Sequence, residues 1–232
     1  MNKKVFFPEH VVQFTSTRDV DFTFPLPSHI LSLTQLVYLK SRLGLEHFPL
    51  LSLKQVHGAD VFKAEDLIDQ GVSLVEGDAL ICQQAGIPIM VRTADCQPVF
   101  IYDQGTDTIG IVHAGWKSTQ LNILVKTLEL MHAAYGTKLD QVTLVMGPSL
   151  RKCCYEVGPE FSEYFPLDVA VINNLRKFDI TAANVRQAVN AGVHPERIFD
   201  SGECTGCQAN KFFSYRREKA AAGRMISVIM KK

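Results

Sequence analysis

The feature that most constrains this chain is an apolar stretch that a polar tetrapeptide interrupts. The stretch is IPIMVRTADCQPVFIYD at residues 87–103, and the interruption is TADC at residues 93–96. Short apolar runs of this kind are typical of buried β-strands. A core strand would favour Val or Ile where Asp95 and Cys96 stand. We therefore predict a buried strand pair, or one long bent strand, with an acid and a thiol that need partners or a function.

The rest of the chain alternates predicted strands with a few amphipathic helices. Strand patterns cover one or two segments within residues 4–18, the two sides of a turn at His57-Gly58, and residues 108–115, 141–150 and 224–232. Helical spacing and capping residues predict helices at 32–45, 118–135 and 181–192. The expected N-cap residues are Ser32 for the first helix, Ser118 or Thr119 for the second and Thr181 for the third. The glycines expected at their C-terminal ends are Gly44, Gly136 and Gly192. Strands outnumber helices, so we predict an α/β or α+β fold with mixed β-sheets.

Composition limits the functional classes. The chain has 232 residues, which we interpret as a single domain, and 24 basic residues balance 24 acidic ones, so no charge surplus points to nucleic acid or an anionic membrane. No apolar run approaches the ~20 residues of a membrane span, and Pro8 interrupts the short N-terminal apolar patch before it reaches signal-peptide length. We expect a cytoplasmic protein whose six cysteines are thiols or ligands. Composition leaves the oligomeric state open.

Three short motifs each place one metal-binding side chain at the end of an apolar strand. They are KQVHG at 54–58, TADC at 93–96 and VHAGW at 112–116. Together His57, Cys96 and His113 would form a His₂Cys set, and three protein ligands with one open position are typical of catalytic zinc. A histidine at a strand end is more often a satisfied polar residue, and the spacing is not that of a zinc finger. The residues alone leave both interpretations open.

The other cysteines give a weaker signal. Cys204 and Cys207 form a C-x-x-C pair in ECTGCQ, whereas Cys153 and Cys154 are adjacent in RKCCYEVG. One C-x-x-C pair without a second is weak evidence for zinc. We expect packed thiols near a loop here, and plain strand filling at Cys82.

A basic segment, FFSYRRE at 212–218, could bring guanidinium groups to a phosphate. Arginine forks bind phosphate oxygens bidentately, although a solvated basic turn would have the same sequence. Trp116 directly follows the VHAG strand end, which favours a place beside a pocket where it could stack on a planar substrate.

Taken together, these motifs resemble a known family. LKQVHGADV, EGDALI, VRTADCQPV, VHAGWK, GPSLRKCCYEVG, CT at 204–205 and FFSYRR followed by GR occur here in the order seen in the multicopper polyphenol oxidoreductase (laccase-like) family. That family is now better regarded as purine nucleoside phosphorylases, and it includes the proteins called peptidoglycan editing factor. The resemblance covers about residues 50–232. It implies an α/β/β/α layered sandwich and zinc bound at His57, Cys96 and His113.

The resemblance also implies an activity. The expected reaction is phosphorolysis of adenosine, inosine and methylthioadenosine to free base and a sugar 1-phosphate, with some adenosine deamination. Copper could bind adventitiously in the same site, but seven histidines without a His-x-His pair do not suit a multicopper centre. The N-terminal FTSTRDVDF departs from the family pattern, because the usual Gly-Gly is missing, and Lys117-Ser118 replaces the usual Arg-Gly.

Several residues are candidates for the chemistry, and the sequence does not choose among them. Asp95, Asp78 or Glu156 could protonate the leaving purine, with Asp95 also a candidate to support the metal ligands. The candidates to neutralise phosphate are Arg18, Arg92, Arg216 and Arg217. An alternative function is a cysteine amidase or hydrolase acting on peptidoglycan precursors, with Cys96 as nucleophile and His113 as base.

Overall fold

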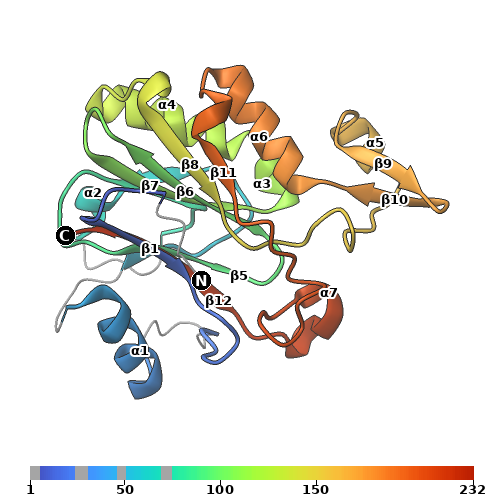
Figure 1. Cartoon of the computed structure of the whole chain (residues 1–232), viewed down its shortest axis with the longest axis horizontal. Helices are drawn as coiled ribbons and strands as arrows, with labels where there is room; N and C mark the ends of the chain where they lie inside the picture. The colour runs from blue at the N-terminus through green and yellow to red at the C-terminus, as the bar shows by residue number, and fades with distance from the viewer. Residues whose placement is uncertain (1–5, 24–30, 46–50, 69–74) are drawn as a thin grey trace.

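Two β-sheets stack face to face in this protein, and helices cover their outer faces (Figure 1). The computed structural model describes residues 6–23, 31–45, 51–68 and 75–232. The arrangement from α4 and α6 through the two sheets to α1 is the predicted α/β/β/α sandwich. Each sheet contains both parallel and antiparallel pairs, as the mixture of adjacent and separated strands predicted.

The larger sheet has six strands in the described part of the chain. Its strand order is β11-β8-β6-β7-β4-β3. The strands are β3 (Val61–Lys63), β4 (Ala79–Cys82), β6 (Gln97–Asp103), β7 (Thr108–Ala114), β8 (Val142–Met146) and β11 (Ile198–Asp200). Strands β6 and β7 pair antiparallel along their full length, from Gln97 opposite Ala114 to Asp103 opposite Thr108. The end of β7 that carries His113 therefore lies beside the start of β6, next to Cys96.

The smaller sheet has the order β1-β12-β5-β2. It consists of β1 (Val11–Thr15), β2 (Leu51–Ser52), β5 (Ile89–Thr93) and β12 (Met225–Lys231). The C-terminal strand β12 pairs antiparallel with both β1 and β5, which places the first and last described strands in one sheet. Helix α1 (Leu33–Leu43) lies against the outer face, where Leu39 and Leu43 pack on Met90 and Val228.

Apolar side chains pack in one layer between the two sheets and in one layer on the outer face of each sheet. Between the sheets, side chains such as Leu80, Ile89 and Phe100 are 0–1% exposed. On the outer face of the larger sheet, Leu124 and Leu128 of α4 (Ile123–Tyr135) and Ala188 of α6 (Ile180–Ala191) pack against strand residues. Burial at roughly 25 cal/mol per Å² of apolar area makes these layers the main source of stability.

The stretch at 87–103 forms two strands that lie in different sheets. Strand β5 belongs to the smaller sheet and β6 to the larger one, so Ala94, Asp95 and Cys96 form the corner where the chain crosses between them. Asp95 has a positive φ of 93°, which is uncommon for a residue with a side chain. The polar interruption in the sequence is thus a sheet-to-sheet corner. The strands around the His57-Gly58 turn, β2 and β3, likewise fall in different sheets.

Helix boundaries agree with the sequence in part. Ser32 caps α1 with a capping box and Gly44 ends it in the left-handed region, as predicted. The predicted start of the 118–135 helix was wrong, because α3 (Trp116–Gln120) begins after Gly115 and a left-handed Asn122 separates it from α4. Thr181 was also wrong as a cap, since Asp179 caps α6 and the Thr181 hydroxyl donates to Gln97 at 2.6 Å.

The remaining elements are short. The short helices are α2 (Ala64–Ile68), α5 (Phe161–Tyr164) and α7 (Tyr215–Glu218). Strands β9 (Val169–Ile172) and β10 (Leu175–Phe178) form a hairpin. Within the described residues, 3₁₀ turns span Leu139–Gln141, Pro195–Arg197 and Lys219–Ala221. In the described part of the chain, no helix combines the length and apolar character needed to cross a membrane.

Candidate metal and active site

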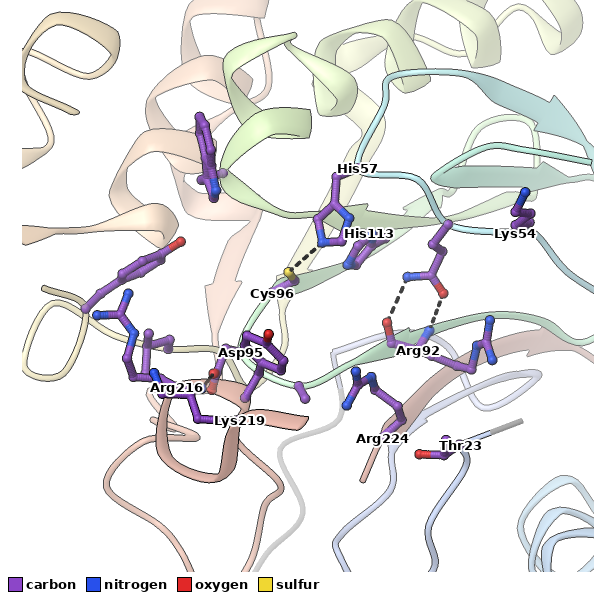
Figure 2. Close-up of a pocket in the computed structure, with 16 residues that line it drawn as sticks. Thr23, Lys54, His57, Arg92, Asp95, Cys96, His113, Arg216, Lys219 and Arg224 are labelled. Atoms are coloured by element: carbon purple, nitrogen blue, oxygen red, sulfur yellow. Dashed lines mark hydrogen bonds between the residues drawn. The ribbon is translucent and has the colours of Figure 1, made fainter. Parts of the chain in front are cut away.

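A cavity of about 770 Å³ opens where the corner at 94–96, the His57 turn and the C-terminal end of β7 meet (Figure 2). All three predicted metal ligands line it. The described residues of its wall are Thr23, Lys54, Gln55, His57, Arg92, Ala94, Asp95, Cys96, His113, Trp116, Leu150, Tyr155, Tyr215, Arg216, Lys219 and Arg224. This volume is in the range of small-molecule binding sites.

His57 is held in the wall by its own backbone. Its φ of 59° lies in the left-handed region, which confirms the predicted turn. The buried carboxylate of Asp78 accepts hydrogen bonds from the backbone N–H groups of Val56 (3.2 Å), His57 (3.1 Å) and Gly58 (2.7 Å). The turn therefore wraps around a carboxylate that fixes where the His57 ring emerges.

The same carboxylate orients His113. The Nδ1 atom of His113 lies 2.7 Å from Asp78 Oδ1, and both side chains are buried. Donation of Nδ1–H to a carboxylate leaves Nε2 as the atom available to a ligand, the arrangement usual behind metal-binding histidines. Asp78 itself is 0% exposed and does not belong to the cavity wall. It thus supports both histidines from behind.

The three ligand atoms converge. Cys96 Sγ lies 3.7 Å from His57 Nε2, and the donor atoms of His57, Cys96 and His113 all fall within 4.8 Å of one another. Gly115 makes this approach feasible, because a Cβ there would lie 2.7 Å from His57 Cδ2 and 3.3 Å from Cys96 Sγ. Two imidazoles and a thiol around a common point are a donor set that fits a borderline divalent cation.

The electrostatics of Cys96 favour the ligand form of its sulfur. Burial raises the pKa of the Cys96 thiol, but the charge of His113 and hydrogen bonds from His113 and His57 outweigh it and lower the pKa to about 6. The thiolate is both the metal-binding and the nucleophilic form of cysteine.

Asp95 lines the cavity, but both of its carboxylate oxygens are engaged. Oδ1 accepts from the Thr205 hydroxyl and Oδ2 from the Arg216 backbone N–H, each at 2.6 Å. Its backbone carbonyl accepts from the N–H of Leu150. Asp95 therefore joins the metal-side corner to the loops that carry Arg216 and Leu150.

Cationic side chains surround the cavity on two sides (Figure 2). Arg92 and Arg224 lie together on one wall, where β5 pairs with β12, and Arg216 and Lys219 lie on the other near Asp95. Burial and the neighbouring charge of Arg224 lower the pKa of Arg92. Among the described residues of the wall, Asp95 is the one acidic side chain, so the cavity is suited to an anionic group.

The structure separates the arginines that the sequence could not rank. Arg216 lines the cavity, where its guanidinium lies over the Tyr155 ring at 5.3 Å and donates to the Glu156 carbonyl at 2.7 Å. Arg217 and Arg18 do not line it. Arg217 instead donates to the carbonyls of Thr205, Gly206 and Phe212, so it braces a loop. Glu156 also lies outside the wall.

Sequence reasoning missed several residues of the wall. Lys54, Gln55 and Tyr155 come from motifs that drew attention for other residues, and Arg224 lies in the GR that follows FFSYRR. Trp116 lines the cavity as expected and packs against Phe161 at 5.1 Å between ring centroids. The missed signal was the family-pattern GR at the start of the last strand.

The expectation of packed thiols holds for Cys204, which is buried, but was wrong for Cys207, which is exposed. Cys153, Cys154, Cys204 and Cys207 bring their sulfurs within 4.8 Å of one another, and Cys153 and Cys207 are exposed. Exposed side chains are not explained by core packing. Cys82, in contrast, is fully buried in the layer between the sheets, as predicted.

Comparison with known proteins identifies the family. The model of the multi-copper polyphenol oxidoreductase laccase family matches residues 34–232. The chain belongs to this family. The matched region begins at residue 34, whereas the motifs in the sequence placed its start near residue 50. It therefore includes nearly all of helix α1.

Relatives in this family carry nucleoside-processing names. A purine nucleoside phosphorylase of Clostridium acetobutylicum is 35% identical over 185 residues, covering 78% of this chain and 76% of that protein. The adenosine deaminase RL5, from an unknown prokaryotic organism, is 34% identical over 209 residues, covering 84% and 79%. The family relationship thus supports an enzyme that acts on nucleosides.

Solved structures confirm the fold. The hypothetical protein YfiH of Bacillus licheniformis superimposes with a TM-score of 0.84 at 25% identity, covering 97% of this chain and 94% of that one. YlmD of Geobacillus stearothermophilus gives a TM-score of 0.82, also at 25% identity, with 97% and 93% covered. The layered sheets are therefore a property of the family.

Proposed function

We propose that this protein is a zinc-dependent purine nucleoside phosphorylase that cleaves adenosine, inosine and methylthioadenosine with phosphate. The observation that carries the proposal is the single cavity wall that combines the His57–Cys96–His113 set with arginines on two sides. The names of the relatives support the reaction class. Adenosine deamination is the proposed side activity.

His57, Cys96 and His113 would hold the zinc ion, with Asp78 as the positioning residue behind them. Zinc bound there supplies a Lewis acid that polarises an oxygen ligand in the cavity. The chain contributes the rigid placement of the ligands, because the Asp78 carboxylate and the missing Cβ of Gly115 set where the rings and the sulfur can lie.

Arg92 and Arg224 form the proposed phosphate subsite. Two neighbouring guanidinium groups in one cavity wall offer several N–H donors to a phosphate, whose oxygens arginine forks bind bidentately. The Arg224 Nη1 donates to the carbonyls of Ala222 and Gly223, which fixes its guanidinium before phosphate arrives. Arg216, fixed by Tyr155 and by the Asp95 contact to its backbone, would neutralise charge from the opposite wall.

The proposed reaction is a displacement at the ribose carbon. An oxygen of hydrogen phosphate forms a bond to C1′ while the bond from C1′ to the purine nitrogen breaks. The bonding electrons leave with the base, which takes up the proton that the hydrogen phosphate gives up. Trp116 and Tyr155 provide aromatic faces in the wall for a purine. Asp95 joins the corner at 94–96 to the wall that carries Arg216, as a carboxylate that accepts two hydrogen bonds.

The test is base release from each nucleoside with phosphate supplied or omitted. We expect adenine from adenosine and methylthioadenosine, and hypoxanthine from inosine, only when phosphate is present, and we expect a chelator to suppress release. Chromatography of adenosine reactions would also show inosine from the side activity. Equal base release with and without phosphate would contradict phosphorolysis and make the protein a hydrolase.

The alternative is a cysteine amidase acting on peptidoglycan precursors, which the lowered pKa of Cys96 beside His113 favours. A cysteine nucleophile would keep its activity when metal is removed and lose it on thiol alkylation. Cleavage of a muramyl peptide amide by chelator-treated protein would support this alternative over the phosphorylase.

Asp78→Asn is expected to weaken zinc binding at the His57–Cys96–His113 site by about 10–100-fold. The asparagine amide would replace an acceptor oxygen with a donor facing the N–H groups of the His57 turn. Competition with a zinc chelator measures the affinity, in a Cys153→Ser/Cys207→Ser background that excludes the second cysteine group. Asp103→Asn is the matched control, because Asp103 is equally buried and accepts from Gly105 and Thr106 elsewhere. Unchanged affinity in Asp78→Asn would remove Asp78 from the site.

A further inference from the structure

Four cysteines from two separate loops meet beside the candidate active site. Cys153 and Cys154 lie in the turn after β8, and Cys204 and Cys207 lie in the loop after β11. The sulfur of Cys153 lies 3.5 Å from that of Cys204 and 3.4 Å from that of Cys207, and the sulfurs of Cys154 and Cys207 are 3.2 Å apart. The sequence separates the two pairs by about fifty residues, so only the fold brings them together.

These separations suit a tetrahedron of thiolates. A zinc–sulfur distance of about 2.3 Å gives a tetrahedral edge of about 3.8 Å, and the four sulfurs lie within 4.8 Å of one another. Disulfide sulfurs would be about 2.05 Å apart. The two exposed members, Cys153 and Cys207, bury little apolar surface that could account for the cluster as packing.

The backbone around the cluster is shaped for this approach. A Cβ on Gly206 would lie 2.8 Å from the Cβ and 3.0 Å from the Sγ of Cys154, so glycine allows the C-x-x-C loop to close on the other pair. Backbone pairing of Ser149 with Cys204 and Thr205 aligns the two loops.

We propose that Cys153, Cys154, Cys204 and Cys207 bind a second, structural zinc ion, separate from the His57–Cys96–His113 site. A closed set of four cysteine ligands is the donor pattern of structural rather than catalytic zinc. Arg217, paired with Glu218, donates to the carbonyls of Thr205 and Gly206 and so braces the loop that carries Cys204 and Cys207. This assignment does not depend on the reaction proposed above.

The site joins two segments that form the active-site wall. Tyr155 follows Cys154 directly, and the loop that carries Cys204 and Cys207 leads to Arg216. Asp95 accepts from Thr205, the residue after Cys204, and from Arg216. A metal that ties these loops together therefore fixes one wall of the cavity without touching the substrate.

Elemental analysis of purified protein tests the assignment. Wild-type protein grown with added zinc is expected to carry about two zinc ions per chain, and Cys153→Ser/Cys207→Ser about one. Cys96→Ser is also expected to carry about one, because it loses only the first site. Cys82→Ala is the matched control, since this buried cysteine belongs to neither group; it should retain about two.

Cobalt substitution provides a second measurement, which is made first on wild-type protein. Wild-type protein loaded with Co²⁺ should show sulfur-to-cobalt absorption from two sites, with the stronger part belonging to four thiolates and retained in Cys96→Ser. Wild-type zinc content of one per chain that Cys153→Ser/Cys207→Ser does not lower would overturn the proposal. An intact mass of fresh protein that shows two disulfides in place of bound metal would overturn it as well.

Discussion

Cys96→Ser and His113→Ala should each lose about one zinc ion per chain and reduce nucleoside cleavage by more than about 100-fold. Cys96 supplies the only sulfur of the His57–Cys96–His113 set, and a serine hydroxyl is a much poorer ligand for zinc. Removal of His113 takes away a ligand and leaves the buried Asp78 carboxylate without its ring partner. Loss of the Lewis acid then removes several kcal/mol of transition-state stabilisation.

The measurement combines metal content with initial rates of inosine cleavage. The Cys153→Ser/Cys207→Ser variant serves as the comparison, because it is expected to lose the other zinc and keep the one at Cys96. Zinc content and rate that remain at the wild-type level in both Cys96→Ser and His113→Ala would contradict the metal site. Full metal with lost activity in Cys96→Ser would point to the cysteine nucleophile.

Arg224→Ala should raise the Michaelis constant for phosphate by about 10–150-fold, and that for nucleoside much less. The basis is the loss of a charged hydrogen bond, which costs about 1.5–3 kcal/mol. Arg92 would remain on that wall, so phosphate would still bind weakly. Arg216→Ala should also raise the Michaelis constant for phosphate, because the Arg216 guanidinium lines the opposite wall of the cavity.

The rates are measured over a range of phosphate at saturating inosine, and the reverse. Arg197→Ala is the matched control, because Arg197 contacts Gln104 and Thr143 away from the cavity. Equal increases in both Michaelis constants for Arg224→Ala would mean that the residue supports the cavity as a whole. An unchanged constant for phosphate would place the phosphate subsite elsewhere.

The sequence singled out His57, Cys96 and His113 as one candidate set, and the structure brings their donor atoms within 4.8 Å of one another. His57 and Cys96 follow strands of the smaller sheet, and His113 lies near the end of β7 in the larger one, so the three gather where the two sheets meet. The role of Asp78 was harder to predict. Its hydrogen bonds reach back to Val56, His57 and Gly58 and across to His113, and those distances depend on how two strands and a turn pack.

The four-cysteine cluster was missed for a similar reason. In the sequence, Cys153-Cys154 and Cys204-Cys207 are two separate and weak signals for a metal site. Strands β8 and β11 are parallel neighbours, and this pairing brings the loops after the two strands to the same edge of the sheet. Arg216 and Arg217 are adjacent in sequence, yet one faces the cavity and the other braces a loop. Their directions are set by the short helix α7, which spacing alone did not reveal.

The fate of phosphate tests the central claim most directly. Zinc-loaded protein is incubated with inosine and inorganic phosphate, and the reaction is followed by phosphorus NMR and chromatography together. The proposed function predicts that inorganic phosphate disappears in equal amount to the hypoxanthine released, with a new resonance for ribose 1-phosphate. Hypoxanthine released together with free ribose, while inorganic phosphate stays constant, would contradict it.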